Sequence, residues 1–454
     1  MSEGQLEARI GEWRQHFLKR QAIRAADVDE LEDHLRSQVD ALRDAGLDED
    51  EAFLVAVKRL GDLDSVSREF ANEYTERLWK QLVVSPGSGD ASPAAQRDTW
   101  LAVGFAIAAA VAIKVPELFG LHMHGPDAAE AFYVRNIGLL VLPFLAAFFA
   151  LKRCLPRAGW SWLVLPFAAA GVIVNLLPFT PNGDTFLLSS IHVPIALWLT
   201  VGFAYAGGRW RSHDQRMNFV RFSGEWFIYY ALIALGGAVL MLFTAFVFEA
   251  IGLSAEPAIE RWILPCGAAG AVLIAAWLVE AKQGVIESMA PVLTMLFTPL
   301  FAVLLLVFIV TMIATGSAID VGREVLIGFD LLLVLVLGLL LYAFSARDTQ
   351  AAPGKFDTLR LLLVLCALVV DGLALWSMVA RTSEFGFSPN KTAALGLNVL
   401  LLVNLGGSAL LYTRFLTGRA AFARLVHWQT TYLPLFAAWA WIVAALFPII
   451  FKYQ

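Results

Sequence analysis

The sequence predicts an all-α, polytopic helical membrane protein with about eleven transmembrane helices and a small N-terminal cytoplasmic domain of four helices. Three observations predict this fold class. The chain of 454 residues is 58% hydrophobic and 16% charged, whereas a soluble domain is about 45–50% apolar and about 25% charged. The apolar residues lie in blocks of roughly 20 residues, the length that crosses a bilayer as a helix. The first 80 residues, by contrast, are polar and highly charged.

The N-terminal segment 1–82 is predicted to form four short helices. Apolar residues step by three or four positions along each helix, which is the helical period. The four stripes are Leu6, Ile10, Trp13 and Phe17; Leu31, Leu35, Val39 and Leu42; Phe53, Ala56, Val57 and Leu60; and Val66, Phe70, Tyr74 and Leu78. Asp27 with Glu30, and Asp48 with Glu51, have the spacing of a capping box and so mark two helix starts. No secretory signal opens the chain, so we expect this domain in the cytoplasm.

Acidic residues dominate the surface predicted for this domain. Residues 1–80 contain 19 acidic and 12 basic side chains, a net charge of −7. Such a surface repels nucleic acid and anionic lipid, so direct nucleic-acid binding is not expected. Two interpretations stay open, a solvated helix surface and a docking face for a basic partner protein. The candidate docking residues are Glu30, Glu32, Asp33, Asp40 and Asp44.

The stretch ELEDHLRSQVDALRDAGLDEDEAFLVAVKRLGD, residues 30–62, resembles the bacterial permease prefix domain, also called the HAAS signalling domain. That family's pattern is an acid-rich ELxxHL helix, a GLxxxEAF turn and an AxxRLGD ending. The resemblance implies a small cytoplasmic helical module fused to varied membrane domains. It also implies a PadR-type transcriptional regulator, or a similar protein, as a cytoplasmic partner. It implies no reaction.

After this domain the chain changes to linker and then to membrane spans. Residues 83–99 are small and polar and contain proline and glycine, a composition typical of a flexible linker. The transmembrane domain is predicted to occupy residues 100–454. Its eleven apolar segments have the approximate limits 100–120, 133–151, 160–179, 186–207, 224–250, 258–281, 288–313, 324–346, 358–380, 391–413 and 429–451.

The distribution of Lys and Arg predicts the orientation. With the N-terminus in the cytoplasm, 14 of these residues fall in cytoplasmic loops and six fall outside, in agreement with the positive-inside rule. Tryptophans such as Trp100, Trp160 and Trp428 lie at span ends, where interfacial anchors are expected. We therefore expect a multi-pass protein of the bacterial cytoplasmic (inner) membrane, surrounded by membrane lipid.

The stretch EFGFSPNK, residues 384–391, lies between the ninth and tenth spans on the predicted outer face. Glycine and proline stop the two helices from fusing into one, and Ser388 or Asn390 can cap the next helix. The charged residues exceed what a tight hairpin needs. The candidate outer hairpin motif is Arg381, Glu384, Gly386, Pro389 and Lys391.

The surrounding stretch ARTSEFGFSPNKTAALGLNVLLLVNL, residues 380–405, resembles a motif of the domain-of-unknown-function 4153 family of bacterial multi-pass membrane proteins. That motif reads roughly Arg-Ile-x-Glu-Tyr-Gly-Leu-Thr-x-x-Arg before an apolar helix. Arg381, Glu384 and Gly386 match it. Phe385 replaces the tyrosine and Lys391 replaces the last arginine, so a phenol hydroxyl and a bidentate fork are lost. The resemblance implies a site without a known chemistry.

Polar residues within the spans form the second candidate site. A charged residue inside a bilayer costs at least about 2.5–3.5 kcal/mol, so it marks function or a buried partner. At roughly 1.5 Å per residue, several such groups lie about 10 Å below the predicted outer surface. Lys114, His192, Asp330 and Asn398 are at this depth, and Asp371 is slightly deeper. A connected outward-opening cavity and separate helix–helix hydrogen bonds both stay open. We expect Lys114 to pair with Asp330 or Asp371, because a lone ammonium is poorly solvated in hydrocarbon.

Motifs of catalysis are not found in the sequence. It has no phosphate-binding loop, metalloprotease motif or nucleophile elbow, so we predict no catalytic residue, no cofactor and no metal, and an enzyme is the least favoured class. The pair His122 and His124 shows no third metal ligand. Two functions stay open. The first is a regulatory or sensing protein whose acidic domain engages a partner in signalling. The second is a permease, or an accessory transporter subunit, that uses an outward-facing polar cavity.

Overall fold

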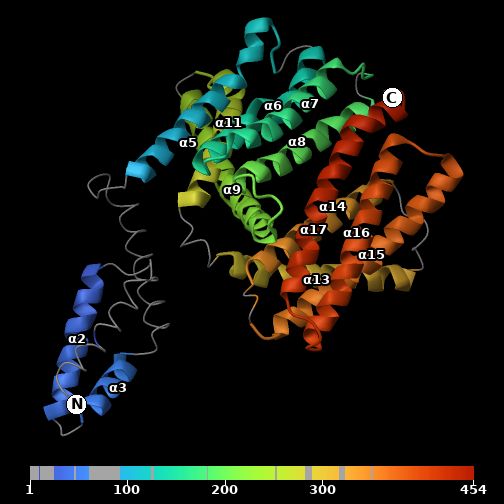
Figure 1. The fold of residues 1–454 in the computed structure, drawn as a ribbon. Coiled ribbons are helices and arrows are strands. Elements are labelled where there is room, and N and C mark those ends of the chain that lie inside the picture. The colour runs from blue at the N-terminus through green and yellow to red at the C-terminus, as the bar shows by residue number, and fades with distance from the viewer. Residues whose placement is uncertain are drawn as a thin grey trace. The chain divides into compact units, whose positions relative to one another are not determined.

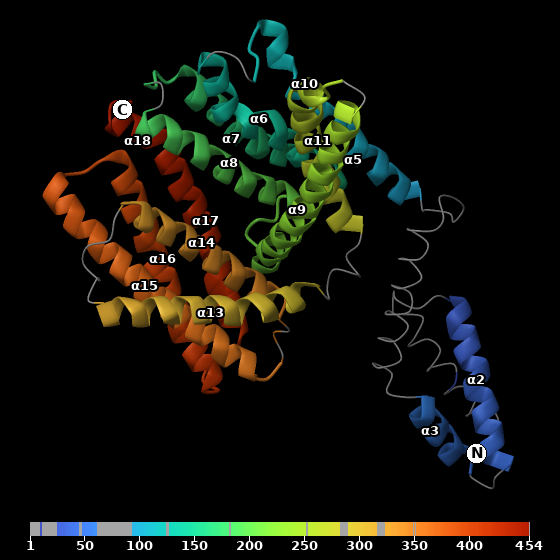
Figure 2. The same cartoon turned by 180° about the vertical axis from the view of Figure 1, so that it is seen from behind.

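The structure is a computed structural model. It describes residues 10, 25–44, 48–60, 93–123, 127–180, 183–250, 253–281, 289–315, 323–347, 349 and 351–453. The regular elements of these residues are helices, and the chain separates into two compact units, Met1–Asp90 and Ala91–Gln454 (Figures 1 and 2). The all-α fold class that the sequence predicts is therefore confirmed.

In the N-terminal unit the structure describes two helices, α2 (Ala25–Asp44) and α3 (Glu49–Leu60), which pack against each other. Their buried apolar side chains come from the second and third predicted stripes and their neighbours: Leu35, Val39, Leu42, Ala52 and Ala56. Asp48 directly precedes α3 and its carbonyl accepts the amide of Ala52 at 2.8 Å, so this helix starts where the capping spacing predicts.

The other predicted helix start is wrong. Asp27 lies inside α2, which already includes Ala25. Alanine has the highest helix propensity, so the residues before Asp27 favour an earlier start than its side chain would set. Of the first predicted helix only Ile10 is described, as a buried helical residue. The fourth predicted helix lies outside the described residues.

The second unit contains eleven helices that are long and apolar enough to cross a membrane, counted over the described residues. This confirms the predicted number of spans. The long helices are α5 (Pro93–Ala112), α6 (Asp127–Lys152), α7 (Arg157–Leu176), α8 (Asp184–Tyr205), α9 (His213–Ala250), α11 (Leu264–Ala281), α13 (Met289–Thr315), α14 (Arg323–Ser345), α15 (Lys355–Phe385), α16 (Pro389–Leu416) and α17 (Ala423–Trp441).

Short helical segments extend three of these spans. The turn η1 (Val115–Phe119) follows α5, the segments α10 (Glu256–Ala258) and η2 (Ile259–Ile263) precede α11, and η3 (Ile442–Leu446) and α18 (Phe447–Ile450) follow α17. Helix α5 begins at Pro93 rather than at Trp100. Proline is favoured in the first turn of a helix, where its missing N–H is not needed. Residues 93–99 of the predicted flexible linker are therefore helical.

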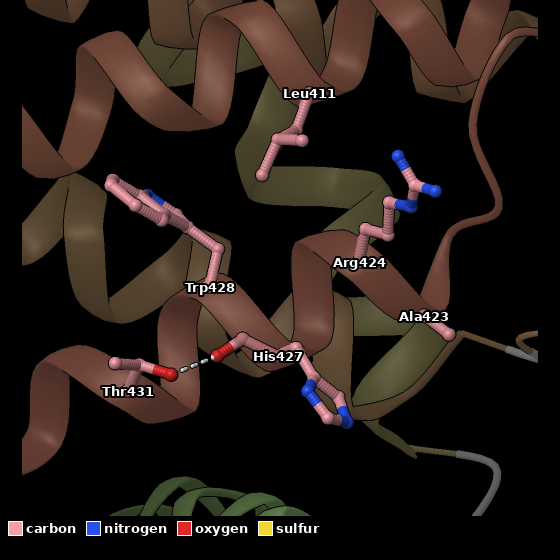
Figure 3. A pocket seen from close by; sticks show the side chains of 6 residues that line it. All are labelled: Leu411, Ala423, Arg424, His427, Trp428 and Thr431. Carbon is pink, nitrogen blue, oxygen red and sulfur yellow. Dashed lines mark hydrogen bonds between the residues drawn. The ribbon is translucent and has the colours of Figure 1, made fainter.

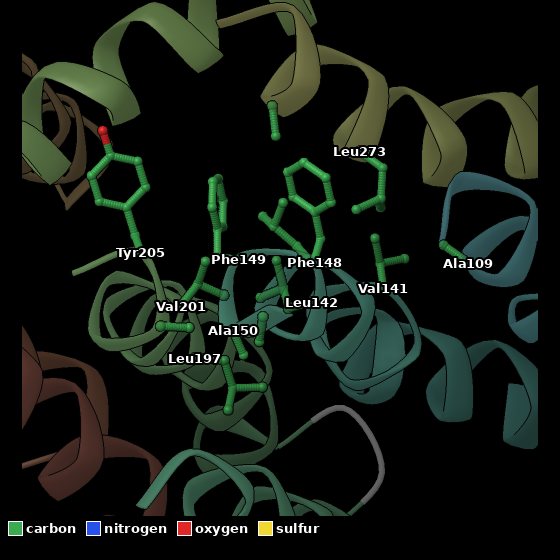
Figure 4. Close-up of a cluster of buried hydrophobic side chains, with 14 of the residues drawn as sticks. Ala109, Val141, Leu142, Phe148, Phe149, Ala150, Leu197, Val201, Tyr205 and Leu273 are labelled. Atoms are coloured by element: carbon green, nitrogen blue, oxygen red, sulfur yellow. The ribbon is translucent and has the colours of Figure 1, made fainter. Parts of the chain in front are cut away.

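The spans form two groups, each around its own apolar core. Helices α5–α9 and α11 lie together in both views, and so do α13–α17 (Figures 1 and 2). In the first core the rings of Phe148, Phe149 and Tyr205 lie side by side, with centroids 5.2 and 5.1 Å apart along the row (Figure 4). The second core consists mainly of Leu and Val side chains around Tyr412. Such interlocked cores hold the helices of each group in fixed positions.

The two groups meet along a seam where α8 and α9 contact helices of the second group, among them α14 and α17. On the seam His213 of α9 contacts Thr430 Oγ1 through Nδ1 at 2.6 Å. The imidazoles of His213 and His427 stack with their centroids 3.8 Å apart. Farther along the seam, the Ser189 hydroxyl donates to the carbonyl of Ala444 at 2.9 Å. Hydrogen bonds and ring stacking thus join segments far apart in the sequence.

Two glycines of α16 each receive a tryptophan of α17. Trp439 lies against Gly396 and Trp428 lies against Gly407, so closely that a Cβ at either glycine would overlap the indole. The two glycines and the two tryptophans are each 11 residues apart, from 396 to 407 and from 428 to 439, which is about three helical turns. The matching intervals fix both the rotation and the height of α17 against α16.

We expect Gly407→Ala to destabilise the protein by about 1–3 kcal/mol, because the added methyl group overpacks the contact with Trp428. Gly406→Ala is a matched control, since a Cβ at Gly406 meets no atom within 4 Å and alanine favours a helix more than glycine does. Thermal unfolding of the detergent-purified variants should lower the midpoint for Gly407→Ala alone. Equal midpoints would contradict the tight Trp428 contact.

Native Cys154 offers a test of the predicted orientation. It is exposed and lies after α6, at the predicted cytoplasmic end. Phe387 is 73% exposed in the predicted outer hairpin. In spheroplasts, a membrane-impermeant maleimide should label a Phe387→Cys variant and leave the natural protein unlabelled. Permeabilisation should then expose Cys154 to the reagent. Both measurements are made in a Cys266→Ala background, because Cys266 is half-exposed near the predicted outer end. Labelling of Cys154 in sealed spheroplasts would reverse the orientation.

Candidate intramembrane polar site

Three of the five predicted intramembrane residues lie together between α14, α15 and α16. The Asn398 amide nitrogen donates to Asp330 Oδ1 at 2.8 Å and contacts Met378 Sδ at 3.3 Å. The carboxyl groups of Asp330 and Asp371 are near enough to repel each other when both are ionised. We call Asp330, Asp371 and Asn398 the intramembrane cluster. Met378 is a neighbour that the sequence did not predict.

The Asp371 side chain is the unusual member of this cluster. Its exposed fraction is 0%, and neither of its carboxylate oxygens has a hydrogen-bond partner in the described part of the chain. Asn398 is equally buried, and its Oδ1 also lacks a partner there. A buried polar group without a partner costs about 1–3 kcal/mol, and a charged one costs more. The cluster therefore holds more acceptor oxygens than donors, which is the balance expected of a site for a cation.

An apolar layer separates the intramembrane cluster from the predicted outer end. It lies about one helical turn outward on each of the three helices. Its residues are Leu326 on α14, Ala374 on α15 and Leu395 on α16, which pack together with Met378. Because residues three and four positions apart share a helix face, each of them covers a member of the cluster. The layer lies on the predicted outward side of the cluster, and the connected cavity stays a prediction.

A second apolar layer lies about one turn inward from the intramembrane cluster. Its residues are Leu333 on α14, Ala367 on α15 and Leu401 on α16, each with an exposed fraction of 0%. The cluster is thus enclosed between two apolar layers along the three helices. Asp330 is only half-buried, so it is the member of the cluster nearest the surface of the helix group.

Lys114 lies elsewhere and has a different partner. Its Nζ contacts Glu117 Oε1 at 2.6 Å and lies 4.6 Å from the ring centroid of Trp262. The predicted pair with Asp330 or Asp371 is therefore wrong. Helix α5 ends at Ala112, and the turn η1 brings Glu117 back to Lys114. Attraction to an acid and to an aromatic face stabilises the ammonium locally.

His192 also lies apart from the intramembrane cluster. Its ring Nδ1 contacts the carbonyl oxygen of Leu188 at 2.8 Å, one turn earlier on the same helix. The five predicted residues thus divide into one cluster of three and two local contacts. Of the five, Asp371 and Asn398 are buried and the other three are half-buried. A similar predicted depth does not establish which helices are neighbours.

The outer hairpin motif forms a close connection between α15 and α16. Gly386 ends α15 with a φ of 75°, a backbone conformation that favours glycine. Ser388 caps α16, because its Oγ accepts the backbone amide of Lys391 at 3.4 Å. The Lys391 ammonium donates to the carbonyl of Gly386 at 3.2 Å. Pro389 is buried in the first turn, and Glu384 is exposed. The motif thus has a structural use in holding the turn.

The acidic face of α2 carries ion pairs within its own helix. The predicted docking residues whose side chains are described are Glu32, Asp33 and Asp40; those of Glu30 and Asp44 lie outside the described side chains. Arg36 donates to Glu32 Oε1 at 2.8 and 3.0 Å, and Arg43 lies 4.0 Å from Asp40. Such pairs contribute about 0.2–0.5 kcal/mol each. They support the interpretation as a solvated helix surface.

A buried ion-pair network at the predicted cytoplasmic end was missed by sequence reasoning. Asp357 is 3% exposed. Its carboxylate accepts Arg347 Nε and Nη2, both at 3.0 Å. It also accepts Arg360 Nη1 at 3.2 Å, the Tyr412 hydroxyl at 3.2 Å and the Gly354 amide at 2.9 Å. We call Arg347, Asp357, Arg360 and Tyr412 the Asp357 clasp. It joins the connection that follows α14 to α15 and α16.

Aromatic rings complete the environment of the clasp. The Arg347 guanidinium carbon lies 4.7 Å from the ring centroid of Phe415 and 4.4 Å from that of Phe422, within cation–π distance. The signal in the sequence was three charges of alternating sign around a short loop, at 347, 357 and 360. The basic residues of that loop predicted the orientation alone, and their pairing with Asp357 was not predicted. Both carboxylate oxygens of Asp357 accept hydrogen bonds, whereas neither oxygen of Asp371 has a donor in the described residues.

A pocket of ≈ 430 Å³ lies near the seam, lined by Leu411, Ala423, Arg424, His427, Trp428 and Thr431 (Figure 3). Leu411 and Trp428 lie on one side of the segment that carries His427, and the His427 imidazole points to the other (Figure 3). The Thr431 hydroxyl bonds the His427 carbonyl at 2.7 Å. An apolar wall with one arginine suits contact with a membrane lipid.

Comparison of the chain with protein-family models, with curated proteins and with solved structures found no match. The resemblances to the permease prefix domain and to the domain-of-unknown-function 4153 family therefore stay predictions. What the structure does show is a multi-helical protein with eleven long apolar helices in its described part, a polytopic membrane protein.

Proposed function

We propose that the chain is a proton-coupled permease or transporter subunit in which the intramembrane cluster binds the coupling proton. The observation that carries the proposal is the Asp371 carboxylate, buried at 0% exposure without a hydrogen-bond donor in the described residues. Ionisable groups inside membrane spans mark ion and proton pathways. A proton is the one cation that satisfies such a carboxylate without any further ligand.

The donor set favours a proton over a metal ion. The described residues contain no group of three or more His, Cys, Asp or Glu side chains that could hold a metal. One oxygen of Asp330 already accepts from Asn398. A sodium ion needs several oxygen ligands at once, whereas two mutually repelling carboxylates can share one proton. Binding of sodium in place of a proton is the alternative that the experiment must distinguish.

The apolar layers on both sides of the intramembrane cluster support coupling. A transporter must close its site from one side before opening it to the other. In our proposal the proton reaches half-buried Asp330 from the outer side after Leu326, Ala374 and Leu395 separate. It then passes to Asp371, whose carboxylate becomes neutral. Neutralising Asp371 removes the penalty for its burial and stabilises the closed state.

A pH jump on full-length protein reconstituted on a solid-supported membrane tests this function without knowledge of the substrate. The natural protein should give a transient current as protons enter the bilayer-embedded site. Asp371→Asn should lose most of that current, because the amide cannot take up a proton. His192→Gln, which lies outside the cluster, should keep it. A current unchanged in Asp371→Asn would refute the proposal, and a response to a sodium jump at constant pH would assign the site to sodium.

Regulation is the second candidate function. The α2–α3 pair has its own buried side chains and belongs to a compact unit separate from the spans, as expected of a module that engages a cytoplasmic partner. Asp33 is exposed on it. A gene for a PadR-type regulator beside the gene for this chain would favour regulation, and a gene for an ATPase would favour transport.

A further inference from the structure

A second pocket, of ≈ 440 Å³, lies at the predicted cytoplasmic end of the first helix group. It is formed where α6 and α11 end and where the connection between α8 and α9 turns. The charged and amide side chains that line it are Arg153, Arg209, Gln215, Asn218, Arg221 and Glu225. Three arginines and one glutamate line this pocket, and Glu280 outside the lining pairs with Arg153, so one guanidinium is in excess. We call it the arginine pocket.

Two of its arginines are held in place by other groups. Arg153 Nη2 donates to both carboxylate oxygens of Glu280 at 2.9 Å, and its guanidinium lies 5.0 Å from the ring centroid of Tyr205. Glu280 also pairs with Lys152 at 3.0 Å. Arg221 donates through Nε to the carbonyl of Ser345 at 3.1 Å. These contacts fix the walls of the pocket before any ligand enters.

The third arginine is available. Arg209 is exposed, and no carboxylate of the described residues lies within ion-pair distance of its guanidinium. Gln215 and Asn218 lie three residues apart in the first turns of α9, so their amides share one face of that helix. A guanidinium and two amides supply hydrogen-bond donors from two directions. Arginine is the residue whose planar donor fork matches phosphate geometry.

We propose that the arginine pocket binds a phosphate-bearing anionic group, with Arg209 as its main contact. The pocket lies at the ends of transmembrane helices, the level of lipid headgroups, and basic pockets between such helices on the cytoplasmic side bind anionic headgroups. Soluble phosphate compounds offer the same chemistry from the cytoplasm. The inference does not depend on the proton site, which lies in the other helix group.

Titration of the full-length protein in detergent separates the two sources. Dioctanoyl phosphatidylglycerol carries the phosphate on a lipid, and glycerol 3-phosphate carries it without acyl chains. We expect the lipid to bind and Arg209→Gln to weaken its binding by about tenfold or more, as expected when a charge-assisted hydrogen bond is lost. Asn218→Asp, which places a negative charge in the pocket, should weaken binding while leaving every arginine in place.

Arg157→Gln is the matched control. Arg157 is exposed at the start of α7, at the same predicted end of the bundle, and does not line the pocket. The Arg157→Gln variant should bind the lipid with the same affinity as the natural protein. Equal affinity for glycerol 3-phosphate would assign the pocket to soluble phosphates, and lipid binding alone would assign it to headgroups. The proposal is overturned if neither compound binds, or if Arg157→Gln weakens binding as much as Arg209→Gln.

Discussion

Replacing Asp371 with leucine is expected to make the protein more stable and to abolish its response to a pH jump. The carboxylate is buried without a donor in the described residues, and its neighbours on the same face of α15 include the apolar residues Ala367 and Ala374. A buried polar group without a hydrogen-bond partner costs about 1–3 kcal/mol, and an apolar side chain at this position removes that cost. The folded state would become more stable, and the site would lose its ability to bind a proton.

Two measurements on one detergent preparation check this expectation. The thermal unfolding midpoint of Asp371→Leu should rise above that of the natural protein, and the pH-jump current after reconstitution should disappear. Residues retained for function commonly reduce stability in this way. A lower midpoint would mean that Asp371 has a stabilising partner and would contradict its assignment as an unsatisfied acceptor.

Replacing Asp357 with leucine, on the same helix, should have the opposite effect. Asp357 receives five hydrogen bonds, including those from Arg347 and Arg360. Removing the acid takes the carboxylate partner away from the guanidinium groups of Arg347 and Arg360, at a cost of about 3–5 kcal/mol. We expect a strongly reduced folded yield on size-exclusion chromatography in detergent.

A third variant distinguishes the loss of charge from the loss of shape at this position. Asp357→Asn keeps the size of the side chain and part of its hydrogen bonding, so its folded yield should lie between those of the leucine variant and the natural protein. The comparison of Asp357→Leu with Asp371→Leu is internally controlled, because both place leucine on α15. If both variants changed stability in the same direction, donors around the carboxylate would not be what separates the two sites.

Hydropathy predicted the eleven spans because crossing a bilayer is a local requirement, met by each segment through its own composition. Hydropathy did not predict the helix ends. Trp100 marks where α5 becomes continuously apolar, but the helix starts at Pro93, since a helix continues into polar sequence until a residue ends it. The amino-acid composition changes at the membrane surface, but a helix can continue across that surface.

The candidate site was predicted in part for a similar reason. Burial depth can be counted along one span, and it selected Asp330, Asp371 and Asn398. Pairing between spans depends on helix packing that a single sequence does not state, so Lys114 was assigned to the wrong acid. Its true partner, Glu117, has an i,i+3 spacing that was visible. The predicted span continued as one regular helix to residue 120 and included both Lys114 and Glu117. The turn η1, which contains Glu117, was therefore not predicted.

The contact between Ser189 and Ala444 has a consequence for how the protein is made. Ala444 belongs to the core of the first helix group, although it lies in the last span. A ribosome delivers α8 to the membrane long before α17, and chains fold as they emerge, beginning at the N-terminus. The core of the first helix group therefore lacks Ala444 until the helices of the second group have been synthesised. We expect chains that stop before residue 423, which lack this contact, to be degraded by membrane proteases faster than chains that include Ala444, as a pulse-chase measurement would show.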